Sequence, residues 1–153
     1  GSPSVIEFNC RFGDPETQPI MMRLESDLVE LCLAALDGDL AETKANWDSR
    51  TAVGVVMAAG GYPGEYEKGK LISGLPEATP AVKVFHAGTR LENGKLTTNG
   101  GRVLCVTALG DTAGQAQQAA YKCVDKINWE GAFCRTDIGY RAILREREQR
   151  PQN

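Results

Sequence analysis

One short run of residues constrains the fold more than any other feature of this sequence. Val103-Leu104-Cys105-Val106 is apolar on both alternating faces, which is typical of a central strand that is covered on both sides. Further strand-like segments occupy residues 52–59, 82–91 and 95–98, and the last strand extends over residues 102–109. Asn93-Gly94 has the turn chemistry of a hairpin between residues 82–91 and 95–98. An antiparallel sheet is therefore expected after residue 50.

Helices are expected to flank this sheet. Asp111 or Thr112 is a good N-cap for a helix that runs to about residue 127. Its apolar positions recur at helical spacing: Ala116, Ala120, Cys123, Val124 and Ile127. A short strand-like segment near residue 133 and a last helix after residue 137 complete the pattern. The polar heads of that last helix, Arg141, Arg145, Glu146 and Arg147, are predicted to form a solvated face.

The pattern before residue 50 predicts one strand followed by two helices. Residues 5–12 alternate apolar and polar side chains, which predicts a strand with Ile6, Phe8, Cys10 and Phe12 on a core face. Gly13-Asp14-Pro15 breaks this strand, and Pro15 with Glu16 can start a short helix. A second helix is expected after its N-cap Asp27, with Gly38 as its stop. Its predicted apolar stripe consists of Leu28, Leu31, Cys32, Ala35 and Leu36.

A division of the chain near residue 50 follows from these patterns. Residues 38–50 are polar and rich in turn formers, so they are the best linker candidate. We predict an α+β chain in two parts, residues 1–50 and residues 51–153.

Composition excludes several classes of protein. Apolar residues make up 42% of the 153 residues and charged residues 24%, enough to bury a core. A net charge of −3 argues against a nucleic-acid partner and against a polybasic membrane surface. Five cysteines without a C-x-x-C pair suggest reduced thiols, and no run approaches the roughly 18 apolar residues of a membrane helix. The expected location is cytoplasmic.

The strongest chemical signal is the polar face of residues 7–11. Glu7 and Asn9 point the same way from a strand, and their hard oxygen atoms suit Mg²⁺. Arg11 lies further along this face, where a guanidinium could contact phosphate oxygens. The alternative is a solvated face of an edge strand.

The turn that follows adds two carboxylates beside a helix start. Backbone N–H groups at such a start favour an anionic ligand, and Asp14 and Glu16 lie next to it. The alternative is that these two carboxylates only cap the helix.

Residues 5–18, Val-Ile-Glu-Phe-Asn-Cys-Arg-Phe-Gly-Asp-Pro-Glu-Thr-Gln, resemble the signature of the phosphoribosylamine–glycine ligases, which are ATP-grasp enzymes of purine biosynthesis. The resemblance continues through most of the chain, in the order that the family has, and it covers only the family's C-terminal third. The further matching blocks are residues 23–24, 26–31, 58–64, 84–89, 99–104 and 135–139.

The resemblance implies a role for each signature residue. Glu7 and Asn9 would bind the divalent metal, Mg²⁺ or Mn²⁺, that bridges the phosphates of ATP. Arg11 would act at the phosphates or the acyl phosphate, and Gly13, Asp14 and Glu16 would line the substrate side. The implied substrates are glycine, 5-phosphoribosylamine and ATP, joined through glycyl phosphate with release of ADP and phosphate.

The resemblance also implies an architecture. Residues 1–50 would close an ATP-grasp domain, and residues 51–153 would form a barrel-like C-terminal domain similar to that of biotin carboxylase. The family's N-terminal domain, ATP lid and nucleotide-binding lysines have no counterpart in these 153 residues. We therefore expect the missing N-terminal portion of the enzyme as partner and no catalysis by the chain alone.

Alternatives to this interpretation remain open. One is another ATP-grasp carboxylate–amine ligase or a biotin-carboxylase relative, and another is a non-catalytic binding module.

Two further features are predicted to be structural. His86, the only histidine, is predicted to have no catalytic role. The glycine-rich residues 60–64 lack the Gly-Lys-Ser/Thr ending of a phosphate loop and are predicted to form a turn that could approach the active site.

Overall fold

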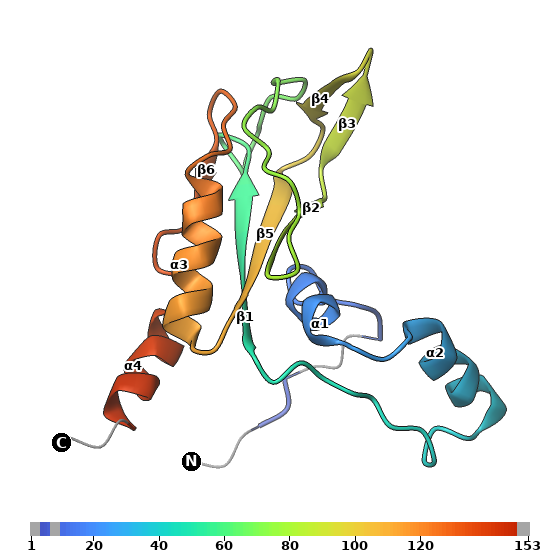
Figure 1. The fold of residues 1–153 in the computed structure, drawn as a ribbon. Coiled ribbons are helices and arrows are strands. Elements are labelled where there is room, and N and C mark those ends of the chain that lie inside the picture. The colour runs from blue at the N-terminus through green and yellow to red at the C-terminus, as the bar shows by residue number, and fades with distance from the viewer. Residues whose placement is uncertain (1–3, 7–9, 150–153) are drawn as a thin grey trace.

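The computed structural model describes residues 4–6 and 10–149. It confirms an α+β fold with antiparallel sheets, and the described part of the chain contains four helices and six strands (Figure 1). In chain order these are α1 (Thr17–Arg23), α2 (Leu28–Asp37), β1 (Thr51–Ala58), β2 (Val82–His86), β3 (Thr89–Glu92), β4 (Lys95–Thr98), β5 (Arg102–Gly110), α3 (Ala113–Val124), β6 (Phe133–Cys134) and α4 (Tyr140–Glu148).

The main sheet has the strand order β2-β5-β1-β6, and every neighbouring pair is antiparallel. The prediction for residues 103–106 is confirmed, because β5 lies between β2 and β1 and is buried from Val103 to Leu109. The alternation of strand side chains places Leu104, Val106 and Ala108 on one face, directly opposite Met57, Val55 and Val53 of β1.

Helix α3 covers this face and completes the core. Its predicted apolar residues, from Ala116 to Ile127, are all buried. Thr112 is the N-cap and accepts a hydrogen bond from the backbone N–H of Gln115 at 3.1 Å. Helix α1 lies on the opposite face, where Pro19 packs over Gly54. A Cβ atom on Gly54 would lie only 3.1 Å from Pro19 Cγ, so the missing side chain lets α1 approach the sheet.

The single strand predicted over residues 82–91 is in fact two strands. Strand β2 pairs with β5, whereas β3 pairs only with β4 in a separate hairpin that extends beyond the main sheet (Figure 1). The break lies at Gly88, whose backbone N–H donates to the Arg102 carbonyl at 2.9 Å and whose carbonyl accepts from Asn99 at 2.7 Å. The first bond still holds Gly88 to β5, and the second closes the base of the β3–β4 hairpin. The predicted turn at Asn93-Gly94 is confirmed, with φ of 49° and 75°.

The strand predicted over residues 5–12 is wrong for the part of that segment that the structure describes. Residues 5 and 6 have no regular structure, and residues 10 and 11 form a bend. Ile6, Cys10 and Phe12, predicted to face a core, are exposed. A strand needs a neighbour to satisfy its backbone, and no pairing among the described residues involves this segment. Glu7, Phe8 and Asn9 lie outside the described residues.

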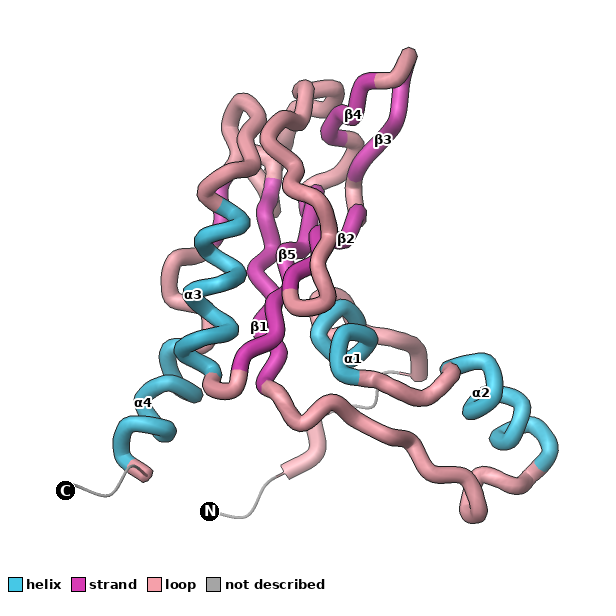
Figure 2. Tube along the Cα trace, in the orientation of Figure 1, coloured by secondary structure: helices cyan, strands magenta, loops and turns pink. Residues whose placement is uncertain are grey.

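Helix α2 begins and ends as predicted, but its apolar stripe is not buried. The Asp27 carboxylate accepts a hydrogen bond from the Val29 N–H at 2.7 Å, and Gly38 ends the helix with φ of 85°. None of the ten residues of α2 is buried, because the helix stands apart from the sheets and from the other helices (Figure 2). Of the predicted stripe, Cys32, Ala35 and Leu36 are exposed, and Leu28 and Leu31 are only half-buried.

One residue of the last helix is not part of a solvated face. The Glu146 carboxylate of α4 accepts hydrogen bonds from the backbone N–H groups of Ala113, at 2.6 Å, and Gly114, at 3.4 Å. The carboxylate therefore caps the N-terminus of α3. Its negative charge also interacts favourably with the positive end of the helix dipole there.

We expect Glu146→Ala to lower the free energy of unfolding by about 1 kcal/mol, because two N–H groups at the start of a core helix lose their acceptor. Urea denaturation measures this change. Glu148→Ala in the same helix is the matched control and should have little effect, since Glu148 is exposed. Equal effects of the two substitutions would contradict the capping role.

No helix in the part of the chain that the structure describes is both long enough and apolar enough to cross a membrane.

Candidate functional site

The segment from residue 10 onwards runs along the surface to the start of α1. Arg11 is exposed, and its guanidinium donates to the Phe12 carbonyl at 3.2 Å. Its side chain therefore remains available to a ligand. The metal ligands predicted beside it, Glu7 and Asn9, lie outside the described residues. Within the described residues, no three His, Cys, Asp or Glu side chains gather where they could hold a metal ion.

Asp14 joins this segment to the main sheet. Its carboxylate lies 3.3 Å from Nε of Arg102, the first residue of β5, and Nη1 of Arg102 donates to the Asp14 carbonyl at 3.2 Å. The two residues are 88 positions apart in the chain. This double contact brings the predicted substrate-side turn to the end of the sheet where β5 begins.

Gly13 and Glu16 lie in the same turn. Glu16 is the N-cap residue of α1, but its side chain makes no capping hydrogen bond. Instead its carboxylate covers Gly13, where an added Cβ atom would overlap it. The Thr17 hydroxyl donates to the Gly13 carbonyl and helps to start the helix. The alternative that Asp14 and Glu16 only cap this helix is therefore not supported, because the Asp14 carboxylate contacts Arg102 and the Glu16 carboxylate makes no capping hydrogen bond.

A cleft of about 400 Å³ opens beside this turn. Its floor is the outer face of β1, with Val56 and Ala58, and Pro15 closes it on the side of α1. This volume lies within the usual range for sites that bind small molecules. The cleft also receives Tyr62 and Pro63, so the glycine-rich turn of residues 60–64 does approach the predicted site residues.

Tyr62 and Gly101 hold the glycine-rich turn in place. The ring of Tyr62 lies so close to Gly101 that an added Cβ atom there would overlap it. The Ala59 N–H donates to the Gly101 carbonyl at 2.8 Å. Close packing of the backbone thus fixes the wall of the cleft that β1 and β5 share.

The opposite wall comes from β6 and the segment that follows it. Phe133, Cys134, Arg135 and Ile138 line it, and α3 anchors it from behind. The Tyr121 hydroxyl donates to the Arg135 carbonyl at 2.7 Å, and Gln117 donates to the Ile138 carbonyl at 2.6 Å. These bonds position a second guanidinium at the cleft.

Neighbouring groups and burial shift the pKa values of two side chains in this wall, Asp137 and Cys134. Arg135 donates to both carboxylate oxygens of Asp137, at 2.8 and 2.7 Å, and so lowers the pKa of Asp137. Burial raises the pKa of the Cys134 thiol, with a smaller contribution from Asp125. Cys134 therefore stays protonated near neutral pH and is a poor nucleophile.

Sequence reasoning missed three residues of the cleft as site residues: Tyr62, Arg102 and Arg135. Each lies within a block that resembles the ligase family, and this resemblance was the signal that could have identified them.

His86 lies outside this cleft. It is exposed at the end of β2, with Nδ1 3.2 Å from the Thr89 hydroxyl.

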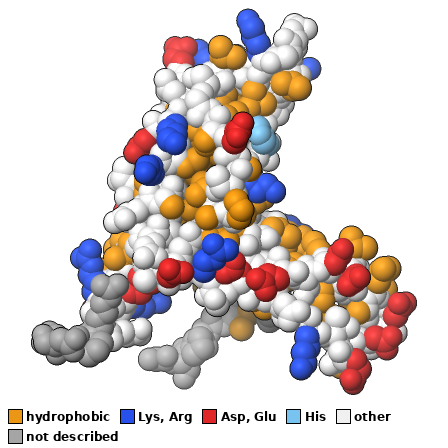
Figure 3. Space-filling view, viewed as in Figure 1, with side chains coloured by type: hydrophobic (Ala, Val, Ile, Leu, Met, Phe, Trp, Pro, Cys, Tyr) orange, Lys and Arg blue, Asp and Glu red, His pale blue; other side chains and the backbone are white. Residues whose placement is uncertain are grey.

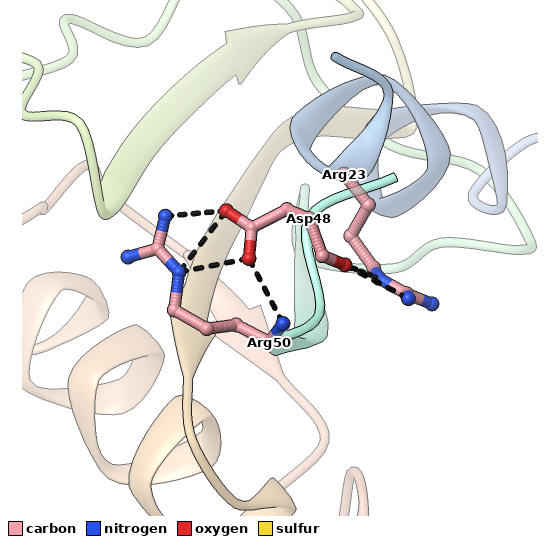
Figure 4. Close-up of polar contacts among 3 residues, drawn as sticks. All are labelled: Arg23, Asp48 and Arg50. Carbon is pink, nitrogen blue, oxygen red and sulfur yellow. Dashed lines mark hydrogen bonds and ion pairs between the residues drawn. The ribbon is translucent and has the colours of Figure 1, made fainter. Parts of the chain in front are cut away.

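A second polar cluster attaches the linker to α1. The Asp48 carboxylate accepts hydrogen bonds from Nε of Arg50 at 3.0 Å and from its backbone N–H at 2.8 Å, and Arg23 donates to the Asp48 carbonyl at 2.9 and 3.1 Å (Figure 4). The side-chain and backbone hydrogen bonds from Arg50 lower the pKa of Asp48 from 3.8 to about 2. This cluster fixes where the chain enters β1.

We expect the stability provided by Asp48 to depend on pH. Because its pKa is lower in the folded chain, its contribution is complete above about pH 4 and is lost as the pH falls towards 2. Asp48→Asn should therefore destabilise the chain at pH 6 and have much less effect near pH 2. Denaturant unfolding at the two pH values measures this, with Asp39→Asn as an exposed control. A deficit of the same size at both pH values would contradict the assignment.

These features define an α+β domain whose main sheet is covered by α3 on one face and carries α1 and a cleft on the other. The chain belongs to the family described as "Phosphoribosylglycinamide synthetase, C domain", whose model matches residues 52–141.

Relatives of known name agree with this assignment. The chain is 64% identical to the phosphoribosylamine–glycine ligase of Vibrio cholerae over 147 residues, which is 95% of this chain and 34% of that protein. The corresponding values are 66% identity for the ligase of Allochromatium vinosum, with 96% and 35% coverage, and 62% for that of Escherichia coli K12, with 95% and 34%. The chain thus spans about a third of the length of these relatives.

A solved structure gives the same answer for the fold. The phosphoribosylamine–glycine ligase of Thermotoga maritima is similar with a TM-score of 0.70 and 38% sequence identity, and the similarity covers 90% of this chain and 34% of that one.

Proposed function

We propose that this chain supplies the C-terminal third of a phosphoribosylamine–glycine ligase, which joins glycine to 5-phosphoribosylamine at the expense of ATP in purine biosynthesis. The observation that carries the proposal is the contact between Asp14 and Arg102. It joins the turn that carries the ligase-like signature to the cleft of the family's C domain. The high identity to named ligases along nearly the whole chain supports the same conclusion.

The proposed reaction has two steps. A carboxylate oxygen of glycine attacks the γ-phosphorus of ATP, and ADP leaves. The amine of phosphoribosylamine then attacks the carbonyl carbon of glycyl phosphate, and phosphate leaves as the amide forms and the amine loses a proton. Such chemistry depends on charge neutralisation and positioning, and it needs no nucleophilic side chain of the protein.

The residues of this chain have distinct proposed roles. Glu7 and Asn9 supply oxygen ligands to Mg²⁺ or Mn²⁺, a role that rests on their residue types and on the family signature. When bound, the divalent ion neutralises charge on the ATP phosphates during phosphoryl transfer. The exposed guanidinium of Arg11 is suited to contact phosphate oxygens, while Gly13, Asp14 and Glu16 line the side where glycine and the amine meet.

The proposal includes an architecture. Residues 1–50 form the end of an ATP-grasp domain, and residues 51–153 form a barrel-like C-terminal domain. In the described part of the chain, every buried apolar residue lies in the range from Val53 to Trp129, which supports this division. The remaining two thirds of the ligase would then supply the rest of the nucleotide site.

The test uses a chimera in which this chain replaces the matching third of the Vibrio cholerae ligase, called the chimera below. We expect ADP release by the chimera to require both glycine and 5-phosphoribosylamine. Bicarbonate should not replace glycine. If bicarbonate supports ADP release and glycine does not, the chain belongs instead to a carboxylase-type ATP-grasp enzyme.

A further inference from the structure

The polar contacts of residues 13–16, called the signature turn below, single out one distant residue. Among the described residues, Arg102 is the only one beyond α1 that makes a hydrogen bond or an ion pair with residues 10–16. Nε of Arg102 lies 3.3 Å from the Asp14 carboxylate, and Nη1 donates to the Asp14 carbonyl at 3.2 Å. One side chain thus holds both the carboxylate and the backbone of the turn.

An irregularity in β5 aims Arg102 at the signature turn. Leu104 of β5 pairs with Met57, on the core face of β1. Arg102 pairs with Ala58, the next residue of β1, which lines the cleft on the opposite face. Val103 has no partner on β1, which is the arrangement of a β-bulge. In a regular strand Arg102 and Leu104 would share a face, so the bulge is what brings the Arg102 side chain to the cleft.

The backbone that carries this side chain is anchored on two sides. The Arg102 carbonyl accepts a hydrogen bond from the Gly88 N–H at 2.9 Å, from the segment after β2. The carbonyl of the preceding residue, Gly101, accepts from the Ala59 N–H at 2.8 Å, from the end of β1. A guanidinium that extends from such a fixed backbone is suited to hold another group in one place.

Stability alone does not explain the contact. The side chains of Arg102 and Asp14 are 40% and 45% exposed, and ion pairs with this exposure stabilise a fold only slightly because water and salt screen them. Figure 3 shows acidic and basic side chains next to each other on the surface of the molecule, so an exposed ion pair is by itself no sign of function. This pair differs in its place, since a β-bulge directs it to the cleft and it joins residues 88 positions apart.

We infer that Arg102 is a positioning residue for the ligation. It acts through Asp14 and holds the signature turn beside the cleft, so that the groups that react are aligned there. The inference rests on the proposed function and deepens it, because Arg102 lies outside the signature of residues 5–18. Arginine suits this role, since its planar fork can hold a carboxylate and a carbonyl in a fixed geometry, whereas the ammonium of lysine is a point charge.

The first test is a double-substitution cycle in the chimera. Arg102→Gln should lower kcat by about 10-fold or more, because small displacements of reacting groups are costly, and it should leave KM for ATP within about 2-fold. When Asp14→Asn is already present, Arg102→Gln should lower kcat by less than about 3-fold further, since the two substitutions break the same contact. Arg102→Lys, which keeps the charge and loses the fork, should recover only part of the rate.

The matched control is Arg90→Gln. Arg90 also forms an exposed ion pair, with Glu92 on the β3–β4 hairpin, and its substitution should leave kcat unchanged. Tm of the Arg102→Gln chimera should stay within about 2 °C of that of the unmodified chimera. A larger loss of Tm, or normal kcat, would overturn the inference. So would a full effect of Arg102→Gln in the presence of Asp14→Asn, because Arg102 would then act on the substrates directly.

A second measurement does not depend on turnover, so failure of the proposed function is detected separately. The Thr17 and Ile20 amides donate to the Gly13 and Glu16 carbonyls of the signature turn. In the 153-residue chain, Arg102→Gln should speed hydrogen exchange of these two amides by about 5-fold or more, while exchange of the β5 amides stays the same. Unchanged exchange at both amides would overturn the inference, even if the chimera has no activity.

Discussion

Replacing Glu7 by Gln in the chimera should lower kcat for ligation by at least about 100-fold. Loss of residues that only support metal ligands commonly costs 10- to 100-fold, and Glu7 is proposed to be a ligand itself. Glutamine keeps the size of the side chain but removes the charge that a divalent cation requires. The Mg²⁺ concentration that gives half-maximal activity should rise as well, which distinguishes a ligand from a residue that only maintains the fold.

The measurement is ADP release at saturating glycine and ATP over a series of Mg²⁺ concentrations. Glu148→Gln, an exposed carboxylate on α4, serves as the control and should leave both the rate and the Mg²⁺ dependence unchanged. Asn9→Ala should act in the same direction as Glu7→Gln. A Glu7→Gln chimera with normal turnover and normal Mg²⁺ dependence would show that the metal site lies elsewhere.

The largest expected effect on stability comes from Leu104→Ala. Leu104 is fully buried in β5, beneath α3 and opposite Met57. Shortening it removes apolar contacts and leaves a cavity in the middle of the core, which typically costs about 2–5 kcal/mol. Leu91→Ala removes the same atoms from a side chain that is 70% exposed and should change stability by less than about 0.5 kcal/mol.

Urea denaturation of the three proteins measures both effects under the same conditions. The difference between the two substitutions isolates burial, because the chemistry of the change is identical. If both variants unfold at the urea concentration that unfolds the unmodified chain, Leu104 does not lie at the centre of a packed core.

Local patterns were sufficient to predict most elements of the C-terminal part, although not the division of residues 82–91 into two strands. The apolar faces of residues 103–106 predict a central strand because a central strand is the only kind that is covered on both sides. Asn93-Gly94 predicts a turn because both residues tolerate positive φ. Asp27, and either Asp111 or Thr112, are predicted as N-caps because capping depends on residues only two or three positions away, and the structure has Asp27 and Thr112 in these positions.

The errors came from contacts between residues distant in sequence. The break at Gly88 depends on backbone hydrogen bonds to residues 99 and 102, which no short window contains. The alternation of residues 5–12 predicts a strand, but a strand forms only beside a partner, and none lies among the described residues. The periodicity of α2 identifies an apolar face without indicating what covers it.

The residues of the candidate site also fall into two groups: those that a local pattern indicates and those that only the fold brings together. The signature of residues 7–16 was identifiable because its carboxylates, amide and guanidinium are close together in the sequence. Arg102 and Arg135 join it only through the fold, since β5 and the segment after β6 bring them to the cleft beside Pro15. Two charged residues far apart in a sequence carry no sign that they share a cleft.

One comparison tests most directly the claim that this chain is a part, and not the whole, of a ligase. Three polypeptides are assayed for ATP-dependent conversion of glycine and 5-phosphoribosylamine to the amide: the 153-residue chain, the Vibrio cholerae ligase without its matching third, and the chimera. We predict product from the chimera alone, at a rate similar to that of the unmodified Vibrio ligase. Turnover by the isolated chain, or a correctly folded chimera without activity, would contradict this account.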